Sequence, residues 1–167
     1  LAEGRKSWNN ELSKIKVRAE DSDYGLSNKI KFYSCFYRTI LFPRQFHEYN
    51  IDGKQIHYSP YNGEVLGGPL YTDNGFWDTF RAVFPFYTIL YPEKLGEIMQ
   101  GIMVNPYKES GWLPEWSSPG HRDCMIGSNS ASIIAEAYLK GIKNFDIDVA
   151  YDGIINLSLI HISEPTR

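Results

Sequence analysis

The sequence GFWDTFRAVFPFYTILYPEKLGEIMQGIM, residues 75–103, contains the clearest helical pattern in the chain. Its second half places apolar side chains three and four residues apart, the spacing of one helix face: Leu95, Ile98, Met99, Ile102 and Met103. Its first half predicts a helix that opens at the GFWDTFR motif and continues to residue 91. Pro85 is expected to kink or divide that helix, because proline lacks the N–H that a helix interior needs.

Helical spacing recurs on both sides of this segment. Residues 27–42 predict a helix with Ser27 as its N-cap and Pro43 as its stop. Residues 8–17 predict a short helix near the N-terminus. Residues 130–142 predict another, which is expected to bury these side chains: Ile133, Ile134, Ala137 and Tyr138.

Two long connections, residues 47–73 and 105–130, separate the helices. The first contains YNIDGKQIHY, residues 49–58, in which a D-G pair between two apolar-polar runs predicts a short β-hairpin. Loops of this length inside a compact domain are usually functional. The element order predicts a mainly α chain whose long loops can gather at one end, as they do in an α/α toroid.

Composition excludes two function classes. The net charge is −3 and no long basic run occurs, so we expect no nucleic-acid partner. No apolar run reaches the roughly 18 residues that a membrane-spanning helix requires, so we expect no membrane span. Phe, Trp and Tyr make up 15% of the residues, which is consistent with a large aromatic core or with a site that stacks on flat ligands.

The cysteines give no metal site. Cys35 and Cys124 lie far apart in the sequence, so they are either two thiols or one disulfide. His121 and Cys124 form a single HxxC, and two ligands do not make a zinc site. We therefore expect no metal bound by these residues.

The C-terminal run NLSLIHISEPTR differs in composition from the rest of the chain. It resembles the conceptual translation of a sequencing adapter. We expect native sequence to end near Ile154 and residues 155–167 to be a non-native tail; the alternative is a genuine frayed C-terminus.

Trp77, Asp78 and Arg81 of the GFWDTFR motif can share one edge of a helix, since they are spaced by three and four residues. One interpretation is structural: Asp78 favours the helix dipole and pairs with Arg81. The other is functional: the indole forms a platform for a sugar ring, and Asp78 and Arg81 bind its hydroxyl groups.

The loop ESGWLPEWSSPGHR, residues 109–122, is a second candidate. Its prolines and glycines give it a defined shape, and its exposed tryptophans need cover from a neighbouring domain or from a carbohydrate. Its polar and aromatic groups complete the set of candidate substrate-binding residues: Glu115, Trp116, His121 and Arg122.

Four stretches, taken in this order, resemble the start of the catalytic domain of glycoside hydrolase family 92, the calcium-dependent exo-α-mannosidases. They are FYSCFYRTILFPR, GFWDTFRAVFPFYTILYPEK, YKESGWLPEWSSPGHRDCMIGSNSAS and AYLKGI. The resemblance covers roughly residues 8–154. It implies that residues 1–22 end a helical linker and that residues 23–154 form the N-terminal portion of an incomplete (α/α)6 toroid, of which only the first helices are present.

The same resemblance implies hydrolysis of terminal α-mannosides with inversion, which uses a general acid and a general base. The family's acid motif EGN and base motif GNDD are absent, so we expect no catalytic residue here and an inactive fragment. Asp78 matches a mannose-binding aspartate, and Trp77 and Arg81 are weaker matches. This chain reads GHRD and GSNS where many members read GNET and GYHS, which leaves the linkage preference and the role of Asn129 open.

The expected cofactor is calcium, with ligands outside these residues. The expected partners are a mannose-containing glycan and the protein's own N-terminal β-sandwich domain, in a periplasmic or secreted protein. Two alternatives remain: a non-catalytic carbohydrate-binding helical module, and a different α/α-toroid glycosidase or lyase.

Overall fold

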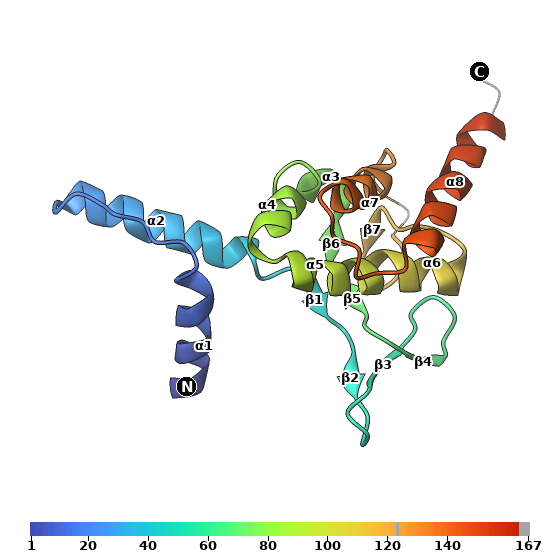
Figure 1. The fold of residues 1–167 in the computed structure, drawn as a ribbon, viewed down its shortest axis with the longest axis horizontal. Helices are drawn as coiled ribbons and strands as arrows, with labels where there is room; N and C mark the ends of the chain where they lie inside the picture. The colour runs from blue at the N-terminus through green and yellow to red at the C-terminus, as the bar shows by residue number, and fades with distance from the viewer. Residues whose placement is uncertain (123, 164–167) are drawn as a thin grey trace. The chain divides into compact units, whose positions relative to one another are not determined.

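The computed structural model describes residues 1–122 and 124–163. The chain forms two compact units, Leu1–Phe42 and Pro43–Arg167 (Figure 1). The division lies between Phe42 and Pro43, whereas the family resemblance places the start of the catalytic domain at residue 23. The predicted linker and domain assignments stay predictions.

The first unit consists of α1 (Ala2–Leu12) and α2 (Asp23–Thr39). The predicted N-cap Ser27 is wrong: Ser22 caps α2, and its Oγ accepts a 3.0 Å hydrogen bond from the Gly25 N–H. The Tyr33 hydroxyl of α2 donates to the Ile15 carbonyl at 2.9 Å, which ties the α1–α2 connection to the helix.

The second unit contains the remaining helices. They are α3 (Phe76–Thr79), α4 (Val83–Leu90), α5 (Pro92–Met99), the π-helix η1 (Gln100–Val104), α6 (Asn105–Ser110), α7 (Asn129–Leu139) and α8 (Ile147–Ser163). The mainly α prediction is confirmed, and these helices fit the first part of an incomplete α/α toroid. The helix at GFWDTFR is divided as expected, but the break precedes Pro85, which lies in the first turn of α4, where its missing N–H is not needed.

The core of the second unit is built on α5 and η1. Leu95, Met99 and Ile102 are fully buried, as the helical spacing predicts. Gly101 is required where η1 passes β5, because a Cβ there would lie 2.7 Å from the Tyr71 ring. The expected burial of Tyr138 is wrong: its side chain is 46% exposed, because α7 packs through its other face.

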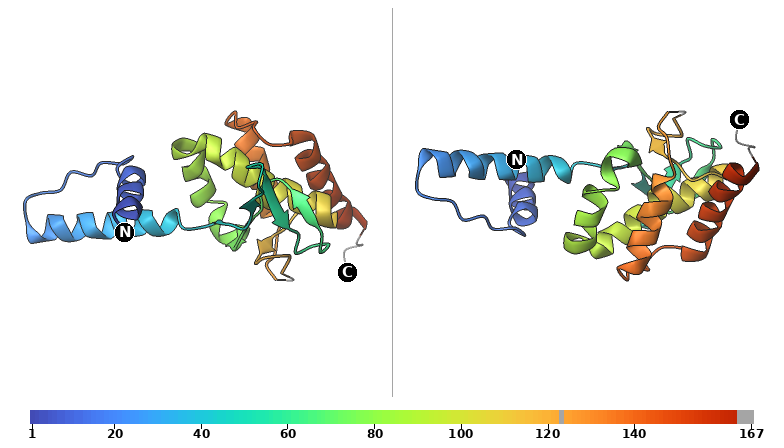
Figure 2. Two further views of the ribbon diagram at one scale, coloured as in Figure 1. Left: turned by 90° about the horizontal axis from the view of Figure 1, so that it is seen from below. Right: turned by 90° about the horizontal axis from the view of Figure 1, so that it is seen from above.

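In the described residues, three small antiparallel sheets accompany the helices. They pair β1 (Arg44–Gln45) with β5 (Tyr71–Thr72), β2 (Glu48–Tyr49) with β3 (Gln55–Tyr58) and β4 (Val65–Gly67), and β6 (Asn74–Gly75) with β7 (Trp116–Ser117). The β2–β3 hairpin confirms the prediction, and β4 forms in a segment that the sequence suggested was loop. This hairpin extends away from the helices of its unit (Figure 1), and the view from below in Figure 2 shows it in front of them.

Helix α8 continues through the boundary that the tail prediction places at residue 155. Leu113 packs on it at Gly153, where a Cβ would lie 2.8 Å from the Leu113 Cγ. The helix does not test the origin of the tail, and residues 164–167 lie outside the described part. None of the helices in the described part is both long and apolar enough to cross a membrane.

Candidate functional site

The pairing of β6 with β7 brings the two candidate motifs together. Asn74 pairs with Ser117 and Gly75 with Trp116, and the Phe76 N–H donates to the Glu115 carbonyl at 3.0 Å. A Cβ on Gly75 would lie 3.0 Å from the Trp116 ring, so this position requires the close approach that glycine allows. The Trp116 ring therefore packs on the backbone immediately before α3.

Helix α3 separates a buried side chain from an exposed polar set. Phe76 is fully buried, whereas Trp77 is 44% exposed and Asp78 is exposed. The Arg81 guanidinium lies 4.8 Å from the Trp77 ring centroid, and its Nη2 donates to the Trp77 carbonyl at 3.3 Å. Arg81 thus stacks on the indole, and the structure forms no ion pair between Arg81 and Asp78.

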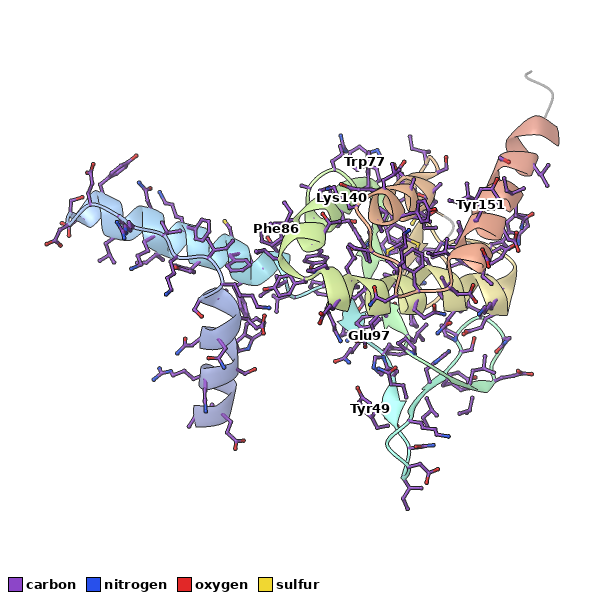
Figure 3. All side chains as sticks on the ribbon, viewed as in Figure 1. Tyr49, Trp77, Phe86, Glu97, Lys140 and Tyr151 are labelled. Atoms are coloured by element: carbon purple, nitrogen blue, oxygen red, sulfur yellow. The ribbon has the colours of Figure 1, made fainter. Side chains whose placement is uncertain are left out.

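The side chain of Asp78 is available for a ligand. Among residues 1–122 and 124–163 it has no hydrogen-bond or ion-pair partner, and it is exposed beside an exposed indole. Figure 3 shows Trp77 and the hairpin residue Tyr49 at opposite sides of the second unit, so this exposed set is separate from the β2–β3 hairpin.

Glu115 has a different environment. Its Oε1 accepts hydrogen bonds from the N–H and hydroxyl of Ser130 at 3.2 and 2.6 Å. Its Oε2 accepts from the N–H and side-chain amide of Asn129 at 3.0 and 3.3 Å. Glu115 therefore caps the N-terminus of α7, which the sequence did not indicate because the acid lies 14 residues upstream of the helix. Its predicted contact with substrate stays a prediction.

His121 and Arg122 hold the shape of the loop. The Nε2 of His121 forms a 2.8 Å hydrogen bond with the Ser110 hydroxyl, and its ring lies edge-to-face with Tyr61, at 4.7 Å between centroids. The Arg122 N–H donates to the Trp116 carbonyl at 3.1 Å, while its side chain is exposed. These contacts place His121 inside the loop and leave the Arg122 guanidinium at the surface.

Tyr61, from the β3–β4 turn, is a further polar-aromatic residue that contacts this loop. Its hydroxyl shares a 3.2 Å hydrogen bond with the Ser117 hydroxyl. Burial raises the pKa of Tyr61 and nearby Glu109 adds to the increase, while the hydrogen bond with Ser117 opposes it. Tyr61 therefore stays protonated and able to donate throughout the neutral range.

Metal-ligating side chains and cysteines are scattered in the described residues. Within 1–122 and 124–163, no three His, Cys, Asp or Glu side chains are grouped so that they could hold an ion. Cys35 and Cys124 are both free, exposed thiols.

Comparisons with known proteins identify a family model and two solved structures that are similar to most of this chain. Residues 1–163 match the glycosyl hydrolase family 92 catalytic domain. The family GH92 inverting mannosidase BT2199 from Bacteroides thetaiotaomicron VPI-5482 is 48% identical, with a TM-score of 0.84 over 92% of this chain and 20% of that chain. The family GH92 alpha-mannosidase BT3965 from Bacteroides thetaiotaomicron is 27% identical, with a TM-score of 0.78 over 95% of this chain and 21% of that chain. No curated protein matches.

Proposed function

This chain belongs to glycosyl hydrolase family 92, and we propose that it is the part of an α-mannosidase that holds the terminal mannose of a glycan. It spans only 20% and 21% of the two mannosidases to which it is similar, so the activity is proposed for a longer parent protein. The observation that carries the proposal is the exposed carboxylate of Asp78, which has no partner among residues 1–122 and 124–163, beside the exposed indole of Trp77.

The chemistry of these residues suits a sugar. A carboxylate accepts hydrogen bonds from two neighbouring hydroxyl groups, and such charge-assisted bonds are shorter and stronger than neutral ones. The Trp77 face offers an apolar surface to the C–H groups of a pyranose ring. Arg81, stacked on that indole, restricts its rotamer and adds donors to the same edge.

Cleavage is assigned to residues outside this chain. Inversion needs a general acid and a general base about 6.5–9.5 Å apart, with a water between the base and the sugar. In this chain Glu115 is committed to capping α7, and Asp78 is assigned to substrate. Our proposal is that the parent supplies the acid, the base, a calcium ion with its ligands and an N-terminal β-sandwich domain, and acts in the periplasm or outside the cell.

The test uses the full-length parent protein. We expect it to release mannose from terminal α-mannosides, to give the inverted anomer by NMR, and to lose activity with EDTA. No release from any α-mannoside would overturn the proposal, and undiminished activity in EDTA would overturn its calcium part. Mannoside binding without hydrolysis would favour a non-catalytic carbohydrate-binding module, and cleavage of another glycan would favour a different toroid glycosidase or lyase.

The site assignment is tested with Asp78→Asn in the same protein. Loss of the charge should lower kcat/KM, and Asp52→Asn, on the exposed hairpin tip, is the matched control with the same change of charge. Equal kcat/KM in both variants would show that Asp78 does not bind substrate.

A further inference from the structure

A buried histidine and a buried glutamate join the three-stranded sheet to α6. His57 lies on β3 and Glu109 near the end of α6, and their side chains are 0% and 5% exposed. The His57 Nε2 lies 2.8 Å from Oε1 of Glu109, and its Nδ1 lies 2.9 Å from the carbonyl oxygen of Gly68. The two residues are separated by 52 positions in the sequence.

The two contacts determine how many protons the pair holds. A carbonyl oxygen only accepts, so the contact with Gly68 requires a proton on Nδ1. If Nε2 then lacked a proton, it would face a carboxylate oxygen as a second acceptor, and the 2.8 Å contact would be repulsive. We infer that His57 and Glu109 share one additional proton between Nε2 and Oε1, and that this pair positions the loop that carries Trp116.

The burial of the Glu109 carboxyl group supports the presence of that proton. Oε2 of Glu109 is buried and has no hydrogen-bond partner in the described part of the protein. A full negative charge on such an oxygen is costly, whereas a neutral carboxylic acid costs much less. The buried, unpaired Oε2 therefore supports the presence of the shared proton, because without that proton Glu109 would carry a full negative charge beside an uncharged imidazole. Tyr61, in the β3–β4 turn, is a titratable group that faces the pair.

The pair is linked to the candidate site through short contacts. Glu109 is followed by Ser110, whose hydroxyl binds His121 at 2.8 Å and accepts from the Trp112 N–H at 3.1 Å. The β3–β4 turn reaches the same loop through Tyr61, which contacts His121 and Ser117. The β3–β4 segment thus contacts the loop in two places, through the His57–Glu109 pair and through Tyr61.

Trp116 is the neighbour of Ser117 in that loop, and its ring packs on Gly75 next to the start of α3. Removal of the shared proton would turn one of the two His57 contacts into a contact between acceptors and would release β3 from α6. His57 and Glu109 are therefore positioning residues. Their importance for substrate rests on the proposed function, but the shared proton does not.

The test is NMR spectroscopy of the 167-residue chain with ¹⁵N-labelled histidine at neutral pH. We expect a protonated Nδ1 on His57 and a downfield proton signal from the Nε2–Oε1 hydrogen bond. In Glu109→Gln the amide can donate to Nε2, so the fold should persist while the downfield signal is lost. Glu64→Gln, on the exposed β3–β4 turn, should keep it.

Two results would overturn the inference about the proton. One is a bare Nδ1 with the proton on Nε2, which is the tautomer that donates to an ionised Glu109. The other is a downfield signal that survives Glu109→Gln.

The positioning role has its own readout, the indole N–H resonance of Trp116, assigned by its loss in Trp116→Phe. Glu109→Ala should shift that resonance, while Glu109→Gln should leave it near the wild-type position. An unmoved resonance in Glu109→Ala would overturn the positioning role, and where Glu109→Ala does not fold, His57→Gln gives the same comparison. These spectra contain no substrate, so their outcome is independent of whether the parent hydrolyses mannosides.

Discussion

Asp78 and Glu115 lie on neighbouring segments that β6 and β7 bring together, yet their carboxylates have opposite environments. Asp78 is exposed and has no partner in the described part of the protein, whereas both oxygens of Glu115 are bound to the N-terminus of α7. The difference shows that an acid in a candidate motif is available to a ligand only if no helix terminus already uses it.

Loss of the Glu115 carboxylate is expected to have the largest effect. Glu115→Ala removes the acceptor for the Asn129 and Ser130 N–H groups, so we expect the free energy of unfolding to fall by about 2–3 kcal/mol. Urea denaturation followed by circular dichroism measures it. Glu64→Ala is the control on an exposed turn, and equal stability of the two variants would contradict the capping role.

Loss of the Asp78 charge should act on binding instead. Asp78→Asn weakens charge-assisted hydrogen bonds, so we expect about a tenfold loss of mannoside affinity in the parent protein, or about 1.4 kcal/mol. The free energy of unfolding should change by less than about 0.5 kcal/mol, because the side chain is exposed and pairs with no residue in the described part of the chain. Calorimetric titration with a mannoside measures the first quantity, and a strongly destabilised variant would remove the contrast with Glu115.

The contact between the two segments is tested at Gly75. In Gly75→Ala the new methyl group lies 3.0 Å from the Trp116 ring, so the ring must move by a few tenths of an ångström, at a cost of about 1 kcal/mol. The change should alter Trp116 fluorescence and lower the melting temperature slightly. Gly53→Ala is unsuitable as a control because its φ is +73°, whereas Gly67→Ala meets no atom within 4 Å and should leave the fluorescence unchanged.

A third acid, Glu97, contributes to the pH dependence of stability, and we expect its substitution to have the smallest effect of this series. Burial alone would raise the pKa of Glu97, but hydrogen bonds from Lys94, Tyr71 and Gln55 outweigh it, so the pKa is lowered. The unfolded state then binds more protons, so this stability is present above the ordinary value of 4.5 and is lost as pH falls through the lower folded pKa.

Glu97→Gln should flatten that part of the profile, measured as the melting temperature between pH 6 and pH 3. The effect is modest because the carboxylate is partly solvated. If the melting temperature of Glu97→Gln fell with pH as steeply as that of the wild type, other carboxylates would be responsible for the loss of stability in acid.

The spacing of apolar residues in the sequence predicted where helices form, but it did not predict which of their side chains are buried. The three- and four-residue spacing identified α5 and η1 because both ends of that pattern lie on one buried face. The same spacing misplaced Tyr138, because it cannot show which side of a helix a neighbour will cover. Ser27 and Ser22 are both acceptable caps in sequence, and the Gly25 N–H selects Ser22.

The candidate site divides in the same way. Trp77, Asp78 and Arg81 could be grouped from sequence because they lie within one turn of chain. The stacking of Arg81 on Trp77 in place of an ion pair with Asp78 could not be read there, since both pairs satisfy helical spacing. The contacts of Tyr61 and His57 could not be predicted, because their partners come from another part of the chain.

The sequence by itself determined the mainly α class, the β2–β3 hairpin and the family, because each depends on residues close together in the chain or on motifs in a set order. Only the tertiary structure decided which acids are committed to the fold. Glu115 meets α7, and Glu109 meets His57, through hydrogen bonds that span 14 and 52 positions. Such bonds depend on how the elements pack, and packing leaves Asp78 as the carboxylate at this site that faces solvent without a protein partner in the described residues.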